Sequence, residues 1–514
     1  MRLWVWSGLI TAFVGVRTAN AAPSLVNPGF ENDGTGVAAP TGWTSSGSVD
    51  ADFTEAGGYS GSFRLSHWSA ASYSVETRQK ISGLSRGWYT LRARVKRSSG
   101  QNDSFIALEC DGRKERAYLP VAPPDTWLTI AVSVEARYGT CNVVLHTAAS
   151  GGEWSNFDDI ELTPGRASLS ILGADVSSLA KSEDLGGYYV DASAAYQCRD
   201  SALSILARHG VNYVRLRAWV NPADGYHNTR ELLRMARRAK SEGLKVLVDL
   251  HYSDTWADPG QQAKPQAWAA FTTEQLRQAV YDYTLDVCRR LKAQGTPPDM
   301  IQLGNELNSG MLWPDGHTWN PPNWDNLAAF LKAGASAVKA SSPSTKIMLH
   351  LANGGDNGLY RWWFDNITSR GVPFDVIGAS YYSYWHGSLG GLQFNLNDVS
   401  ARYGKDIVVV ETGYPFTLAD EDGWPNLIGT NDQLVSGYPA TPEGQARNVR
   451  DVLAIVRAVP NQRGLGAFYW EATWTAVPGN GWDPNDPTSG NAWENQALFD
   501  FNSTSLPALD VFRP

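Results

Sequence analysis

Two different hydrophobic patterns divide the chain near residue 165. Residues 23–163 are rich in Gly, Ser and Thr and contain runs in which apolar and polar residues alternate, such as Trp88–Val95 and Trp127–Val134. Alternation with a period of two between turn-rich segments predicts an all-β sandwich. Pro164-Gly165 then fits a short hinge. We therefore expect a β-sandwich domain over residues 22–164 and a second domain over residues 165–514.

The second region alternates short apolar runs with longer amphipathic segments, which predicts alternating strands and helices. The expected strands are Leu169–Ala174, Val211–Arg217, Lys245–Leu250, Met300–Asn305, Lys346–Leu351, Phe374–Ser380, Ile407–Glu411 and Gly464–Trp470. The expected helices are Arg199–His209, Glu231–Glu242, Thr273–Ala293, Trp324–Ala340, Leu359–Arg370, Leu392–Tyr403 and Pro442–Ala458. Eight such units over about 340 residues favour an α/β fold of the (β/α)8 TIM-barrel type. A doubly wound open sheet would normally carry a Gly-rich phosphate loop after its first strand, and Ala174–Ser178 is not one.

The C-terminal ends of the predicted strands all carry polar or aromatic residues. In a (β/α)8 barrel the active site lies at these ends. The residues found there are Asp175, Arg215 or Arg217, His251, Asn305-Glu306, Asn353, Tyr381 or Tyr382, Glu411 and Trp470. Because strand side chains alternate between faces, we expect one of the two arginines to point into the barrel. An isolated carboxylate at a strand end is usually a helix cap or a solvated loop residue, so only the joint pattern indicates function.

Glu306 and Glu411 end the fourth and seventh predicted strands, nearly opposite each other across a narrow barrel. Hydrolysis of a glycosidic bond needs one carboxylic acid to protonate the leaving oxygen and a second, ionised carboxylate on the other face of the sugar. A carboxyl separation of about 5–5.5 Å gives retention of configuration. We expect Glu306 to be the acid/base, with a raised pKa, and Glu411 to be the nucleophile. In this hypothesis Arg215 keeps Glu411 ionised, Asn305 bonds the sugar 2-hydroxyl, and Trp470 forms the floor of the cleavage subsite.

Composition and processing signals place the protein among exported, soluble chains. Its 514 residues include 43 basic and 52 acidic residues, for a net charge of −9, which argues against nucleic-acid or anionic-membrane binding. Residues 1–21 match a secretory signal, with Arg2, an apolar stretch and the small residues Ala19 and Ala21 at a cleavage site. Cys110 and Cys141 lie in strand-like runs of the first domain and could pair, which exported proteins allow. We do not expect Cys198 and Cys288 to pair.

Several uncommon sequence motifs identify a family. Within the retaining barrel glycosidases of clan A, the chain resembles glycoside hydrolase family 53, the endo-β-1,4-galactanases, over about residues 169–512. The matching stretches are Gly173–Ser178, Val214–Pro222, Asp249–Pro259, Gly304–Glu306, Leu312–Pro314 and Phe468–Glu471. The resemblance implies hydrolysis of β-1,4-galactan, the side chain of pectic arabinogalactan, and the catalytic roles given above. It also favours Arg215 over Arg217 and Tyr382 over Tyr381, and we expect His251, Trp313, Trp482 and Trp493 to contact sugar.

An oxygen-rich loop follows Glu411. Alternating oxygen ligands followed by a glycine are typical of a loop that wraps calcium, although no terminal Glu makes this an EF-hand. The resemblance implies a structural calcium ion that ties this loop to the loop after the eighth strand. Its predicted ligands are Asp420, Asp422, the carbonyl of Trp424, Asn426, Asn491 and Glu494. The alternative is a solvated acidic turn.

The edges of the first domain, Asn27–Glu31 and Phe157–Leu162, resemble those of β-sandwich carbohydrate-binding modules, and module family 61, which binds β-1,4-galactan, is the best match. Similar modules hold a structural calcium, here with Glu31 and Asp158 or Asp159. The candidate sugar platforms are Trp43, Trp68 and Trp154, and core packing is the alternative for each. Tethering would keep the barrel near polymer.

Three functions remain open from the sequence. The first is a secreted, monomeric, retaining endo-β-1,4-galactanase that acts on polysaccharide and uses no organic cofactor. The second is another clan A β-glycanase, such as a mannanase or glucanase. The third is a lectin or adhesin with an inactive barrel, which would require the loss of one catalytic glutamate, and both are present.

Overall fold

The computed structural model describes residues 24–194 and 198–513, so the predicted signal segment 1–21 lies outside the described residues. The first part forms two antiparallel sheets of five strands each, in the orders β1-β4-β9-β6-β7 and β2-β3-β10-β5-β8. The strands are β1 Thr44–Gly47, β2 Asp52–Ala56, β3 Phe63–Trp68, β4 Tyr73–Ser82, β5 Gly87–Arg97, β6 Gln101–Cys110, β7 Arg113–Tyr118, β8 Leu128–Ala136, β9 Thr140–Ala149 and β10 Trp154–Pro164. Along β4 every second residue is buried, as period-two alternation requires. The β-sandwich prediction is confirmed.

Cys110 and Cys141 face each other across the pairing of β6 with β9 and form a disulfide bond. The bond closes a loop of 31 residues inside the β-sandwich domain. Cys198 is exposed and Cys288 is buried, and both are free.

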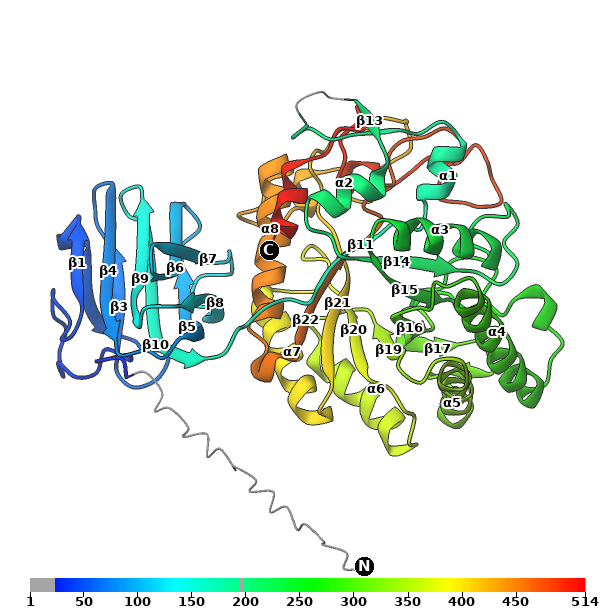
Figure 1. Ribbon diagram of the computed structural model, residues 1–514, viewed down its shortest axis with the longest axis horizontal. Coiled ribbons are helices and arrows are strands. Elements are labelled where there is room, and N and C mark those ends of the chain that lie inside the picture. The colour runs from blue at the N-terminus through cyan, green and yellow to red at the C-terminus, as the bar shows by residue number, and fades with distance from the viewer. Residues whose placement is uncertain (1–23, 195–197, 514) are drawn as a thin grey trace, which may run out of the picture.

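The second part is a closed barrel of eight parallel strands in the order β11-β14-β15-β16-β19-β20-β21-β22, which confirms the fold prediction (Figure 1). These strands are β11 Ile171–Asp175, β14 Tyr213–Ala218, β15 Lys245–Leu250, β16 Met300–Leu303, β19 Lys346–Leu351, β20 Val376–Ser380, β21 Asp406–Thr412 and β22 Gly464–Tyr469. The helices around it are α1 Leu179–Asp184, α2 Ala202–Arg208, α3 Thr229–Ser241, α4 Thr273–Ala293, α5 Trp324–Ser341, α6 Asn357–Ser369, α7 Leu389–Tyr403 and α8 Pro442–Arg457. In the described residues no helix is long and apolar enough to cross a bilayer.

The short elements lie in the loops. They are β12 Tyr189–Val190, β13 Arg199–Asp200, β17 Gly310–Met311, β18 Gly316–His317, η1 Val49–Ala51, η2 Gln266–Trp268, η3 Leu307–Ser309, η4 Asn431–Gln433, η5 Pro460–Gln462, η6 Glu494–Gln496 and η7 Pro507–Phe512. The expected helix Arg199–His209 therefore begins later than predicted, because Arg199 and Asp200 pair with β12.

The interior of the barrel consists of an apolar layer below a polar layer. The apolar layer contains Ile171, Tyr213, Leu247, Met300, Met348, Val376, Val408, Val410 and Phe468. Side chains two residues further along a strand point to the same face. Two residues after Tyr213, Leu247 and Met348, towards the C-terminal ends of their strands, come Arg215, Asp249 and His350. All three are buried. The sequence pattern of the strands therefore places polar and charged groups directly above the apolar layer.

The β-sandwich domain is packed against the barrel beside α8 (Figure 1). The backbone N–H of Val121 donates to Asp451 Oδ2 on α8 over 3.1 Å, and the Tyr438 hydroxyl donates to the same oxygen over 2.8 Å. Asp451 is only 1% exposed. Thr129 on β8 exchanges two hydrogen bonds with the Gln393 side chain on α7. The two domains therefore share a specific, partly buried interface in addition to the linker.

Candidate active site

A cavity of about 410 Å³ opens at the C-terminal ends of the barrel strands. Glu306, which directly follows the Gly304-Asn305 turn after β16, and Glu411, within β21, both line it. The remaining lining is mostly aromatic or polar. The structure therefore brings the two predicted catalytic glutamates to one cavity.

Glu411 is held at both carboxylate oxygens. Oε1 lies 2.9 Å from Nη2 of Arg215, and Oε2 accepts a 3.1 Å hydrogen bond from the Tyr382 hydroxyl. The residue is only 5% exposed. Burial raises the pKa of the Glu411 carboxyl, and the positive charge of Arg215 opposes that shift. The contacts orient the carboxylate and favour its ionised form.

Glu306 is held differently, because none of the described Lys, Arg or His side chains forms an ion pair with its carboxylate. Its backbone lies in the left-handed region at φ 44°, and its Oε1 accepts a 2.6 Å hydrogen bond from Ser380 Oγ. Burial, followed by the charge of Glu411, raises the pKa of Glu306 to about 8. Of the two glutamates, Glu306 is therefore the one that keeps its proton at neutral pH.

A directed hydrogen-bond chain ends on Glu306. Nδ1 of His350 accepts the backbone N–H of Glu306 at 3.3 Å and lies 3.0 Å from Nε2 of Gln302. Burial lowers the pKa of His350 well below its ordinary value, so the ring is neutral. Two N–H donors and one acceptor, Asn305 Oδ1 at 3.1 Å, surround Nδ1, and this majority of donors favours the tautomer with the proton on Nε2. This Nε2 lies 2.8 Å from Ser380 Oγ. The serine hydroxyl then donates its own proton to Glu306 Oε1, which leaves Oε2 as the oxygen that carries the proton of the neutral carboxyl.

Arg215 forms the centre of the polar layer. Its guanidinium contacts Asp175 at 2.9 Å and Asp249 at 2.8 Å, in addition to Glu411. Nη2 also donates to Asn305 Oδ1 over 2.8 Å. Burial opposes the charge, but the surrounding carboxylates outweigh burial and raise the pKa of Arg215. Arg215 therefore remains a cation and links the Asn305 amide to the Glu411 carboxylate.

The expectation that only one arginine points into the barrel is wrong. Arg215 and Arg217 are two residues apart on β14 and so share a face, and both line the cavity. Arg217 contacts Glu471 at 3.0 Å, and its guanidinium lies 4.1 Å above the ring of Trp256. Burial raises the pKa of Glu471 to about 7. Arg217 thus orients the ring of Trp256, whereas Arg215 orients the carboxylate of Glu411.

The predicted sugar-contacting residues are divided between the cavity and its surroundings. His251, Asn305, Tyr382, Trp470, Trp482 and Trp493 line the cavity. Tyr381 instead donates to the Gly387 carbonyl and is fully buried. Trp313 does not line this cavity, because its indole donates to the Ser309 carbonyl and its ring packs on His317. A sugar contact of Trp313 stays a prediction.

Several lining residues were not predicted from the sequence. Those with aromatic or ionisable side chains are Trp256, Asp258, Trp385 and His386. The ring of Trp256 stacks on Trp482 with centroids 5.1 Å apart and planes inclined by 19°. Trp256 and Asp258 lie inside the Asp249–Pro259 motif, which was the signal that could have found them. Trp385 and His386 lie in a loop after β20 whose path the strand pattern does not determine.

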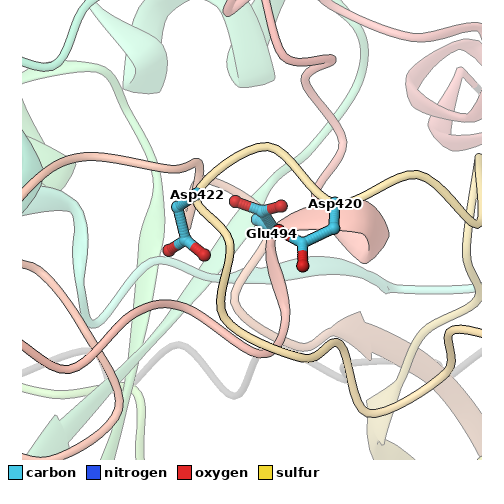
Figure 2. A group of neighbouring side chains, drawn as sticks. All are labelled: Asp420, Asp422 and Glu494. Carbon is cyan, nitrogen blue, oxygen red and sulfur yellow. The ribbon is translucent and has the colours of Figure 1, made fainter.

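The acidic loop after Glu411 forms a cluster with a residue from the loop after β22 (Figure 2). One oxygen from each of Asp420, Asp422 and Glu494 lies within 4.8 Å of the others. Glu494 is fully buried, and burial raises its pKa to about 7. Oε2 of Glu494 and Oδ1 of Asn426 are buried oxygens without a hydrogen-bond partner. Such a set of oxygen ligands fits a hard divalent cation.

The other two predicted calcium ligands, Asn491 and Trp424, donate backbone hydrogen bonds to the Asp422 carboxylate. The Asn491 backbone N–H donates to Asp422 Oδ2 over 2.6 Å, while its side-chain oxygen accepts the Trp493 backbone N–H. The Trp424 backbone N–H donates to Asp422 Oδ1 over 2.8 Å. Both residues orient Asp422, and direct ligation by them stays a prediction.

The β-sandwich domain carries a groove on the face of its β2-β3-β10-β5-β8 sheet. Trp68 on β3 and Trp154 on β10 are direct cross-strand partners, and both line it with Glu55, Arg64, Ser66, Lys96, Asp125 and Asn156. Trp43 is different, because it is 6% exposed and packs on Phe30 in the core. The expected sugar contact of Trp43 is therefore not supported, and core packing accounts for it.

The carboxylates proposed for a second calcium already accept backbone donors. Glu31 Oε1 accepts the N–H groups of Ser62 and Phe63, and Asp158 Oδ2 accepts that of Tyr59. The Asp159 carboxylate accepts the hydroxyl of Ser60. These bonds brace the loop between β2 and β3, and a calcium ion at this position stays a prediction.

Comparison with known proteins agrees with this geometry. Residues 171–512 match the model of glycosyl hydrolase family 53. The arabinogalactan endo-beta-1,4-galactanase of Thermothelomyces thermophilus is 36% identical over 353 residues, which cover 67% of this chain and 99% of that protein. The endo-beta-1,4-galactanase of Bacillus subtilis (strain 168) is 35% identical over 67% of this chain and 85% of its own length.

A solved family 53 catalytic domain from Ignisphaera aggregans superposes with a TM-score of 0.64 at 41% identity. The match covers 68% of this chain and 96% of that domain. The two glutamates in one cavity, the closed barrel and these matches lead to one conclusion. The chain is a glycoside hydrolase and belongs to glycosyl hydrolase family 53.

Proposed function

We propose that this protein is a retaining endo-β-1,4-galactanase that cleaves β-1,4-galactan, such as the side chains of pectic arabinogalactan. One observation carries the proposal: a neutral Glu306 and a cation-bound Glu411 line the same cavity. The names of the 35–36% identical relatives support galactan as the substrate. A mannanase or glucanase would use the same pair, so residue chemistry alone does not choose the sugar.

The first chemical step forms a covalent intermediate. The Glu411 carboxylate attacks the anomeric carbon, and the bond from that carbon to the leaving galactose oxygen breaks. Oε2 of Glu306 gives its proton to the leaving oxygen, so the departing sugar ends as a neutral alcohol. Ser380 supports this transfer, because its hydrogen bond occupies Oε1 and presents Oε2 to the substrate.

The second step regenerates the enzyme. Ionised Glu306 takes a proton from a water molecule, whose oxygen attacks the anomeric carbon and breaks the bond to Glu411. Arg215 and Tyr382 then receive the freed carboxylate in its original position. Asn305 is oriented by Arg215 and by its own donation to the Ala257 carbonyl, which leaves one amide hydrogen for the sugar 2-hydroxyl.

The experiment that tests the reaction combines a polysaccharide panel with stereochemistry. We expect hydrolysis of β-1,4-galactan and none of mannan or cellulose, and proton NMR should show the β-anomer as the first product. Glu411→Ala should reduce turnover by several powers of ten while substrate still binds. An initial α-anomer would contradict retention, and activity on mannan alone would contradict the substrate.

We also propose that a calcium ion joins Asp420, Asp422, Asn426 and Glu494. The unpaired buried oxygens of Asn426 and Glu494 support this assignment. Calcium would pin the loop after β21 to the loop that carries Trp482 and Trp493, both of which line the cavity. A chelator should lower the melting temperature of wild-type protein, whereas Asp422→Asn protein should respond less. An identical melting temperature with and without chelator would contradict the site.

We further propose that the β-sandwich domain binds galactan through Trp68 and Trp154. Their rings are cross-strand neighbours beside charged and amide side chains, which is the combination a sugar site requires. Trp68→Ala and Trp154→Ala should weaken retention on galactan, while Trp88→Ala, an exposed tryptophan outside the groove, should not. We propose finally that the chain is exported and acts as a monomer; the Cys110–Cys141 disulfide supports an oxidising compartment.

A further inference from the structure

Two tryptophan rings lie together on the surface of the barrel and outside the catalytic cavity. Trp319 is 53% exposed and Trp362 is 37% exposed. Their centroids are 5.6 Å apart and their planes are inclined by 39°. Neither lines the cavity that holds the two glutamates. Tryptophan is enriched at binding surfaces, because its ring is apolar and its indole N–H is polar.

Trp362 packs on buried aromatic side chains of the barrel helices. Trp324, at the first position of α5, packs edge-to-face on Trp362 with centroids 5.0 Å apart and is only 8% exposed. The next residue on α6, Trp363, is fully buried and donates its indole N–H to the Leu307 carbonyl over 2.7 Å. Trp362 therefore sits on a packed aromatic base, so ligand binding would cost little side-chain entropy.

Trp319 is carried by the loop that follows the acid/base residue. The preceding Thr318 bonds back to Asn308 and Ser309 through its hydroxyl and its backbone N–H, at 2.9 and 3.1 Å. β17 and β18 pair within the same loop. The Trp319 backbone N–H donates to His317 Nδ1 over 3.2 Å. One ring of the platform, Trp319, is thus carried by the segment that begins at Glu306, whereas the other, Trp362, is carried by α6.

We propose that Trp319 and Trp362 form a second sugar-binding site on the barrel, in addition to the cavity. This site holds β-1,4-galactan on the barrel surface while another part of the same galactan molecule occupies the cavity. The size of the patch favours a sugar over a protein. Two tryptophans exposed to these fractions offer about 200 Å² of ring surface. A stable protein interface needs about 800 Å² from each partner. One or two pyranose rings match the smaller area, and this occupant rests on the galactanase function proposed above.

The test separates this platform from the groove of the β-sandwich domain. All variants are made in full-length protein that also carries Trp68→Ala and Trp154→Ala, so that the barrel surface dominates the remaining retention. Mobility is then measured by electrophoresis in gels with and without soluble β-1,4-galactan. Trp319→Ala and the double variant with Trp362→Ala should lose about three- to tenfold in apparent affinity. Phe394→Ala is the control, because Phe394 is 62% exposed on α7 and far in sequence from both rings.

Kinetics give a second readout. The KM for polymeric galactan should rise by a similar factor in the platform variants, while kcat/KM for an aryl β-galactobioside, which fills only the cavity, should stay at its parent value. Trp319→Ala alone serves as the folding-safe variant, since Trp319 is a surface loop residue and Trp362 keeps its base.

Each remaining outcome decides the proposal. Unchanged retention and unchanged KM on polymer in the double variant would overturn it. Altered sedimentation of the double variant with unchanged retention would identify the patch as a contact between copies and would also overturn it. If the parent protein hydrolyses no galactan, the proposed function fails; with an active parent, the tryptophan variants judge the platform alone.

Discussion

Replacing Ser380 by Ala should move the alkaline limb of the pH–activity profile upward. Ser380 Oγ donates to Oε1 of Glu306 over 2.6 Å and is itself fully buried. This hydrogen bond stabilises ionised Glu306 more than protonated Glu306, so it lowers a pKa that burial and Glu411 raise to about 8. Without the hydroxyl, the carboxyl should hold its proton to a higher pH.

The size of the shift follows from the two protonation states. A hydrogen bond to a charged group contributes about 1.5–3 kcal/mol, and one to a neutral group about 0.5–1.5 kcal/mol. The difference of about 1–1.5 kcal/mol corresponds to about one pKa unit. The alkaline limb of kcat/KM should therefore move from about pH 8 to about pH 9.

Loss of the same contact should also affect rate. Oε2 is no longer selected for the catalytic proton, so proton donation to a galactose leaving group should be slower by about tenfold. An aryl galactoside with an acidic phenol needs little protonation and should react at a nearly normal rate. The assay is the pH dependence of kcat/KM on both substrates. Ser383→Ala is the control, because Ser383 accepts from Asn448 and makes no bond to Glu306.

Two results would refute the reasoning about Ser380. A limb that stays at its wild-type pH would show that the serine does not discriminate between the two states of Glu306. Equal losses on the natural and the aryl substrate would show that the damage is general and not confined to proton donation.

Three further predictions concern the domain interface, the disulfide bond and the packing of Trp493. Tyr438→Phe should lower the free energy of unfolding by about 1–2 kcal/mol in urea titrations, because it removes a donor to buried Asp451, whose same oxygen accepts the Val121 N–H across the domain interface; no loss would show that this shared acceptor does not stabilise the fold. Paired Cys110→Ser and Cys141→Ser substitutions should cost about 4 kcal/mol for a 31-residue loop, and reductant should reproduce the effect in wild-type protein. Gly413→Ala should lower kcat/KM on galactan about tenfold, since the added methyl group would lie 2.5 Å from the ring of Trp493; normal kinetics would show that Trp493 can move freely.

The positions of the two glutamates were predictable because they depend on few physical rules. Apolar runs gave the strand ends, and parallel strands bring their C-terminal ends to one rim. The same rules also apply to other side chains that line the barrel interior. Ser380 and His350 both point inward and both lie two residues beyond buried positions of their strands. Correct use of this two-residue period would have found the chain that ends on Glu306 and would have kept Arg217 in the cavity.

Features that depend on loop paths or on burial were not predictable in this way. Trp43 and Trp68 are identical residues in strand-rich sequence, yet one is 6% exposed and the other 44% exposed. Trp385 lines the cavity from the loop between β20 and α7, and no strand pattern determines the path of that loop. The disulfide required the register of β6 against β9, which no local pattern supplies. In each case the deciding information is a tertiary contact or a loop path, and neither is encoded in the local alternation of apolar and polar residues.

The interface between the domains changes how the β-sandwich domain would assist catalysis. A freely tethered domain raises the local concentration of polymer in all directions, and longer linkers dilute the effect. Here buried Asp451, Tyr438 and the paired bonds of Gln393 and Thr129 fix the orientation of the groove relative to the barrel. A groove in a fixed orientation increases the hydrolysis only of galactan molecules that extend from the groove to the cavity in the right direction. The increase should therefore depend on the length of the polymer. If the groove binds galactan as proposed, the domain would act as a directional guide rather than a flexible anchor, and short oligosaccharides should gain nothing from it.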